Sequence, residues 1–262
     1  MNHLQDFDSD RLALVSSECN TIGVPELDPF VDRGLITRIH ASLTSGKEGA
    51  VFCCRAHPST RSKFLAAKVY REHAASAHKW SATYFEGRER NLKETEVRAI
   101  QRRTAFGRRL AGSLWVEAEF TVLKQLATAG ADTPRPVACA DRAILMEYIG
   151  NGAQPAPHLD GVQFRPHEAR RVYAQILDNI TLFLANNLVH GDLSPYNILY
   201  WKDQAWIIDV PQAVDARFNH SALTLLHRDV KNVQDHFARF GVSGDAARIA
   251  DDLWNQYRRA AL

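Results

Sequence analysis

One segment of the chain, residues 188–215, constrains the fold more than any other. It contains an aspartate two residues after a histidine, an asparagine five residues further on, and an acid at the end of the apolar run WIID. We interpret its first part, VHGDLSPYNILY, as a loop that leaves a helix and enters a short strand. Asp192, Asn197 and Asp209 are therefore expected to lie together where this loop meets the end of the next strand.

These three side chains have the chemistry of a phosphoryl-transfer site. Asp192 can accept a proton from a hydroxyl nucleophile. The amide oxygen of Asn197 and the carboxylate of Asp209 are hard ligands that suit Mg²⁺, which is usually completed by water and phosphate oxygens. The spacing H-x-D-x-x-x-x-N, with an acid twelve residues after the asparagine, is a more specific signal than any single motif elsewhere in the chain.

A small antiparallel sheet is expected over residues 41–72. LTSGKEGAVFCCRA has the pattern of strand, glycine turn and strand, and KFLAAKVYRE has the pattern of a third strand. Gly46 and Gly49 would let backbone amides approach phosphates in the turn. Lys68 lies in an apolar strand and needs a counter-charge, which could be a phosphate, a glutamate on a later helix, or both.

That glutamate is expected to be Glu119. It shares one face of the predicted helix over residues 113–130 with apolar side chains, whereas Glu117 and Lys124 are expected to face solvent. Two short strands are expected around Asp141. Apolar spacing predicts further helices over residues 29–40, where Gly34 interrupts the pattern, and over 167–187, 222–241 and 244–261.

The segment 73–111 differs in composition from its neighbours because it is rich in charged residues. From residue 88 to residue 109 it holds eight Lys or Arg against three Glu. One interpretation is a solvated helix that follows a flexible loop. The other is a basic surface that meets an acidic partner or RNA.

Composition excludes several other classes. The net charge of +2 gives no overall argument for a nucleic-acid partner, and the apolar runs are too short to cross a bilayer. We expect no signal peptide and no membrane partner. The four cysteines lack C-x-x-C spacing, which argues against a zinc site and fits a reducing, cytoplasmic location.

The motifs in this order resemble the RIO family of atypical serine/threonine protein kinases, over about residues 29–241. The strings that carry the resemblance are SGKEGAVF, AAKVY, WVEAEF, PRPVA, LMEYIG, LVHGDLSPYN, IIDVPQAV and RDVKNVQDHF. The chain resembles most strongly the bacterial members of the branch that lacks an N-terminal winged helix.

The resemblance implies an α+β, two-lobed protein-kinase-like fold with ATP and Mg²⁺ or Mn²⁺ between a β-rich N-lobe and an α-rich C-lobe. The implied domains are an N-terminal extension with a helix (1–40), the N-lobe with a charged, flexible or helical insert at 73–111 (41–147), and the C-lobe (148–262). Neither an activation loop nor a peptide-docking segment is expected, because A-P-E is absent and few residues follow Asp209 before the next helix.

The resemblance also assigns roles to individual residues. Asp192 would be the catalytic aspartate, Lys68 would contact the phosphates and pair with Glu119, and Asn197 and Asp209 would bind the metal. His190 would brace the catalytic loop rather than react. The residues implied in ATP binding, besides Lys68, are Ser45, Gly46, Lys47, Glu48, Val51, Ala66, Met146, Glu147, Ile149 and Leu199.

Three functions stay open on the sequence. The first is phosphoryl transfer from ATP to serine or threonine hydroxyls of an unknown protein or of the chain itself. The second is a small-molecule phosphotransferase of the aminoglycoside or choline kinase type, since such enzymes share HGDL-x-x-x-N. The third is an ATPase switch that senses a ribosomal or RNA partner through residues 88–109.

Overall fold

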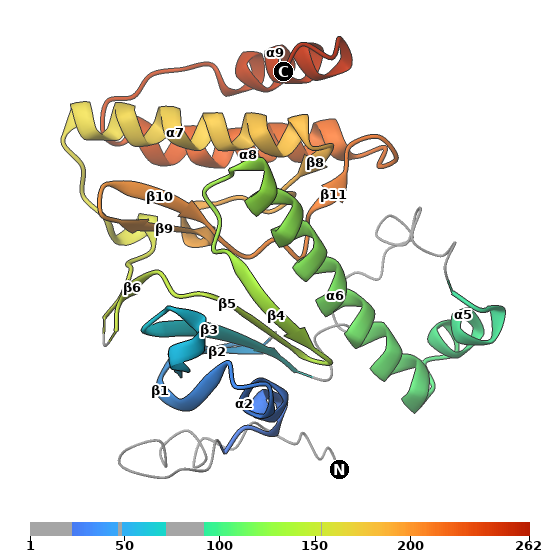
Figure 1. Cartoon of the computed structure of the whole chain (residues 1–262). Helices are drawn as coiled ribbons and strands as arrows, with labels where there is room; N and C mark the ends of the chain where they lie inside the picture. Colours follow the sequence, from blue (N-terminus) through green and yellow to red (C-terminus); the bar gives the residue numbers. More distant parts are fainter. Residues whose placement is uncertain (1–22, 47–48, 72–91, 153) are drawn as a thin grey trace, which may run out of the picture.

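The structure, a computed structural model, describes residues 23–46, 49–71, 92–152 and 154–262. A β-rich N-terminal half is followed by a helical C-terminal half, and the long helix α6 runs beside the sheet (Figure 1). This order agrees with the α+β arrangement expected from the sequence.

The N-terminal half is built on a five-stranded sheet with the order β1-β2-β3-β5-β4, in which all neighbouring strands are antiparallel. The three strands expected before residue 72 and the two expected around Asp141 are all present. Their bounds are β1 Ile36–Ser45, β2 Gly49–Ala56, β3 Phe64–Tyr70, β4 Pro136–Ala140 and β5 Ala143–Glu147.

The two faces of this sheet pack against different partners. Because side chains alternate along a strand, Ala67 and Val69 of β3 lie on one face and Lys68 and Tyr70 on the other. The first face packs in a cluster with Phe30 of helix α2 (Asp28–Asp32). The second face belongs to the large core that includes α6. Lys68 is thereby turned toward α6 and the C-terminal half.

Helix α6, Ala105–Ala129, starts eight residues earlier than the sequence predicts. The hydroxyl of Thr104 accepts a hydrogen bond from the Gly107 N–H at 3.0 Å and caps the new N-terminus. A side chain at Gly107 would collide with the carbonyl of Ala99 in helix α5, Glu94–Gln101. The charged part of the insert therefore folds as α5 and the first turns of α6, while residues 72–91, with the rest of the insert, lie outside the described residues.

The helix predicted over residues 29–40 is wrong beyond its first turn. Helix α2 ends at Asp32, and β1 begins at Ile36, which pairs with Ala56. Gly34 adopts a left-handed conformation that ends the helix, and the β-branched residues after it favour a strand. The boundary expected between residues 40 and 41 falls inside β1.

The C-terminal half packs three helices, with α9 above the pair α7 and α8 (Figure 1). Their bounds are α7 Pro166–Ala185, α8 Ala222–Ala238 and α9 Ala246–Arg258. Two short hairpins and one further antiparallel pair complete it. The hairpins are β6 Gly150–Asn151 with β7 Gln154–Pro155 and β9 Ile198–Trp201 with β10 Gln204–Ile207, and the pair is β8 Leu188–Val189 with β11 Val214–Asp215. No helix in the described part of the chain combines the length and the apolar content that a bilayer span requires.

A single acid, Asp132, ties the end of α6 to the C-terminal half. Its carboxylate accepts hydrogen bonds from Gln175 and Asn179 of α7, each at 2.8 Å, and from Gln204 of β10 at 2.5 Å. Its backbone carbonyl accepts from the Ile207 N–H at 2.8 Å. Asp132 thus fixes where β10 ends, and with it the segment that carries Asp209.

Replacing Asp132 by alanine is expected to lower the free energy of unfolding by about 3 kcal/mol, because three part-buried amides lose a charged acceptor. Urea denaturation measures this. The matched control is Asp252→Ala on α9, where the side chain is exposed and its ion pair with Arg248 is 3.8 Å long. That control is expected to change stability by less than about 0.5 kcal/mol, and equal losses in the two variants would contradict the role given to Asp132.

Candidate active site

Residues 190–197, which carry the aspartate expected to be catalytic, lie between short strands. β8 precedes this segment and pairs with β11, and a single 3₁₀ turn, Pro195–Asn197, leads into β9. The amide of Asn197 donates to the backbone carbonyl of Asp192 at 2.8 Å. The Asp192 side chain remains 61% exposed, which leaves it accessible to a substrate hydroxyl.

Gly191 explains why this loop reads H-G-D. Its φ is +79°, a left-handed conformation that strains other residues, and a Cβ there would lie 2.8 Å from the carbonyl oxygen of Gln212. A residue with a side chain, such as arginine, cannot occupy this backbone without strain.

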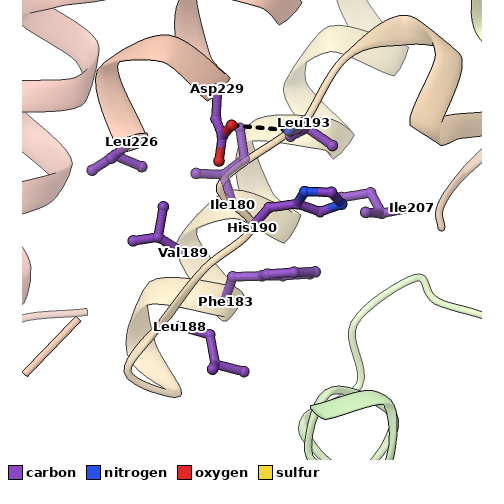
Figure 2. Close-up of a pocket in the computed structure, with 9 residues that line it drawn as sticks. All are labelled: Ile180, Phe183, Leu188, Val189, His190, Leu193, Ile207, Leu226 and Asp229. Atoms are coloured by element: carbon purple, nitrogen blue, oxygen red, sulfur yellow. Dashed lines mark hydrogen bonds between the residues drawn. The ribbon is translucent and has the colours of Figure 1, made fainter. Parts of the chain in front are cut away.

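The loop backbone is anchored from below by Asp229 of α8. The Asp229 carboxylate is buried and accepts hydrogen bonds from the N–H groups of Gly191 at 2.8 Å and Leu193 at 2.9 Å. Figure 2 shows it pointing at the loop beside His190. Burial raises the pKa of Asp229 above its usual value, although these donors oppose the shift. The sequence analysis missed this residue, and its signal was an acid on the apolar face of a helix.

His190 has the bracing role expected of it. Its Nδ1 accepts from the Asp192 N–H at 3.3 Å, so the ring proton lies on Nε2, which donates to the Ile208 carbonyl at 3.2 Å. The ring stacks on Phe183 with centroids 6.0 Å apart. A cavity of about 10 Å³ beneath the loop, lined by both rings, is large enough for one water at most (Figure 2).

Lys68 joins the two halves of the molecule. Its Nζ lies 2.9 Å from Glu119 Oε1 and also forms an ion pair with Asp209. Burial lowers the pKa of Lys68, but the carboxylates of Asp209 and Glu119 outweigh this and hold it well above the usual value. The pairing with Glu119 was expected, whereas the direct contact with Asp209 was not.

The two acids respond differently to this site. Burial raises the pKa of Glu119, and Lys68 only partly offsets that effect. For Asp209 the ammonium of Lys68 overcomes the effect of burial and lowers the pKa. Asp209 also has a φ of +63°, a left-handed conformation that aspartate tolerates better than most residues other than glycine.

Asn197 and Asp209 are brought together through the backbone. Ile208, next to Asp209, donates its N–H to the Asn197 carbonyl at 2.9 Å. Within the described residues no three His, Cys, Asp or Glu side chains form a metal cluster. Two protein oxygens fit a Mg²⁺ ion whose remaining ligands are phosphate and water, rather than a closed protein cage.

Several residues implied in nucleotide binding share the Lys68 face of the sheet. Val51 pairs with Lys68, and Ala66 pairs with Met146, so their side chains lie on that face. Leu199 lies in β9 of the opposite half.

The remaining implied residues within the described chain lie at or just beyond strand ends. Glu147 is the last residue of β5 and Ile149 follows two residues later, where its carbonyl accepts a hydrogen bond from the Ala156 N–H at 3.0 Å. Ser45 ends β1, and the Gly46 N–H donates to the Gly49 carbonyl at 2.8 Å. Lys47 and Glu48 lie outside the described residues.

A cation that the sequence analysis missed lies beside Asp192. Arg228 of α8 donates to the Gly191 carbonyl, and its Nη2 is 3.8 Å from Asp192 Oδ1. Only the folded loop brings the two together, because 36 residues separate them in the chain.

The sequence also matches a known protein family and its members. The family model of the RIO domain matches residues 50–249. The serine/threonine-protein kinase RIO1 of Chaetomium thermophilum is 34% identical over 81% of the chain and 42% of its own length, and human RIO1 is 33% identical over 82% and 36%. The chain thus spans well under half of these relatives. The RIO-type kinase Rio1 of Thermoplasma acidophilum is 34% identical over 53% of the chain and 71% of its own length.

A solved structure supports the fold. The Rio2 kinase–ADP/Mg²⁺–phosphoaspartate complex from Chaetomium thermophilum matches with a TM-score of 0.60 and 20% identity, over 90% of this chain and 69% of that one. The two-lobed, kinase-like fold predicted from the sequence is thereby confirmed. From the matched family model and these relatives, the chain belongs to the RIO family.

Proposed function

We propose that the protein transfers the terminal phosphoryl group of ATP to serine or threonine hydroxyls. The observation that carries this proposal is the contact of Lys68 with Glu119 on one side and Asp209 on the other, next to an exposed Asp192. Relatives named serine/threonine-protein kinases support a protein acceptor, which could be another protein or the chain itself. The small-molecule alternative is not favoured.

In this mechanism Asp192 orients the acceptor hydroxyl and takes its proton. Lys68, held by Glu119, gives up its ion pair with Asp209 and binds the phosphates of ATP instead. Mg²⁺ or Mn²⁺, held by Asn197 and Asp209, would neutralise phosphate charge when bound. Positioning and electrostatics supply most of the rate gain in such sites.

The nucleotide is proposed to lie on the Lys68 face of the sheet. Val51, Ala66 and Met146 would contact the base from above and Leu199 from below, while the backbone of Glu147 and Ile149 would meet its polar edge. Ser45, Gly46, Lys47 and Glu48 would form the phosphate loop.

The location of the protein and its macromolecular partner are also proposals. We place the protein in the cytoplasm, and we assign residues 88–109 as the contact for an acidic partner such as ribosomal RNA. In the described part of that segment Arg98, Arg102, Arg103 and Arg109 are exposed, although Arg98 also pairs with Glu94.

Asp192→Asn is expected to reduce phosphoryl transfer at least about 100-fold, because the asparagine cannot accept the proton. Transfer from radiolabelled ATP to the protein itself and to protein fractions measures this, with calorimetry for ATP binding, which is expected to stay unchanged. Near-normal transfer would refute the assignment. ATP hydrolysis without any transfer in the wild type would favour the ATPase switch.

Asp209→Asn is expected to weaken Mg²⁺–ATP binding at least about 10-fold, because the metal loses a charged ligand. Asparagine is chosen because it tolerates the left-handed backbone. With EDTA the variant is expected to bind ATP at least as tightly as the wild type, since Lys68 is freed from its carboxylate. A loss of the same size with and without metal would argue against Asp209 as a ligand, and Asp252→Ala serves as the control.

A further inference from the structure

Tyr70 forms a hydrogen bond with the carboxylate oxygen of Glu119 that Lys68 does not contact. It is the last residue of β3, two residues after Lys68 on the same face, and only 2% of it is exposed. Its hydroxyl donates to Glu119 Oε2, while Lys68 donates to Glu119 Oε1. Both oxygens of this buried carboxylate are therefore satisfied by one strand.

The tyrosine also contacts the lysine directly. The Lys68 ammonium lies 4.9 Å from the centroid of the Tyr70 ring, within the range of a cation–π interaction. Burial, followed by the nearby carboxylate of Glu119, raises the pKa of Tyr70 well above its usual value. The hydroxyl consequently stays protonated and remains a donor to Glu119.

Trp115 extends this contact to the loop that carries Asp209. It lies one turn before Glu119 on α6, and its ring centroid is 5.5 Å from that of Tyr70. Its Nε1 donates to the carbonyl of Pro211 at 3.4 Å, two residues beyond Asp209. Asp209 in turn pairs with Lys68, so strand, helix and loop form a closed circuit of contacts around the ammonium.

A buried carboxylate held at only one oxygen can rotate, and its second oxygen would lack a partner. The Tyr70 hydroxyl removes that freedom and leaves Oε1 directed at Lys68. We propose that Tyr70 is a positioning residue. It fixes the orientation of Glu119, which in turn holds Lys68 where it binds the ATP phosphates. This inference rests on the proposed function and adds a residue that the Lys68–Glu119 pair alone does not reveal.

The test is Tyr70→Phe, which keeps the ring against Trp115 and removes only the hydroxyl. The expected result is a KM for ATP and a dissociation constant for Mg²⁺–ATP that are both raised about 10-fold. The matched control is Tyr173→Phe in α7, where a buried tyrosine donates to Gln234 Oε1 at 2.6 Å in the C-terminal core. This control is expected to lose similar thermal stability and to keep wild-type constants for ATP.

A double-mutant cycle with Glu119→Gln tests whether Tyr70 acts through Glu119. Adding Tyr70→Phe to Glu119→Gln is expected to change ATP binding less than about 2-fold, because the partner carboxylate is already gone. Constants within 2-fold of wild type in Tyr70→Phe, an equal loss in Tyr173→Phe, or a full loss in the Glu119→Gln background would each overturn the inference.

The wild-type protein in the same assays separates this inference from the proposed function. Binding without transfer refutes the proposed reaction and leaves the role of Tyr70 to be judged by the dissociation constants. A wild type that binds no nucleotide refutes both.

Discussion

The charge on Lys68 is the constraint around which the molecule is arranged. A buried ammonium is costly unless carboxylates surround it, and here they come from two separate elements, Glu119 on α6 and Asp209 beyond β10. Satisfying one cation thus fixes how the sheet, the long helix and the C-terminal half meet. The same arrangement places a strong positive charge where ATP phosphates are proposed to bind.

Buried acids organise the loops around this centre. Asp229 holds the N–H groups of the catalytic loop, and Asp132 holds three amides from α7 and β10. Neither acid is one of the proposed catalytic groups. Each converts irregular backbone into a fixed surface, because a loop secured by charged hydrogen bonds cannot shift without leaving a buried carboxylate unpaired.

The sequence predicted the structure correctly where a short stretch of residues determines the local conformation. The apolar setting of Lys68 called for a counter-charge, helical spacing pointed to Glu119, and the family resemblance implied their pairing, which the structure shows. The sequence did not predict element boundaries or contacts that depend on packing against a distant segment. The early start of α6 depends on α5 packing at Gly107, and the strand at Ile36 depends on pairing with β2. Asp229, Arg228 and Tyr70 gained their contacts only when distant segments met.

The backbone at Gly191 has an evolutionary consequence. Because its φ is left-handed and a Cβ there would lie 2.8 Å from the carbonyl oxygen of Gln212, any side chain at this position would strain the loop that carries Asp192. A larger residue at position 191 would have to be accompanied by a shift of Gln212, three residues after Asp209. Sequence change in related chains is consequently expected to fall on neighbouring positions rather than on residue 191.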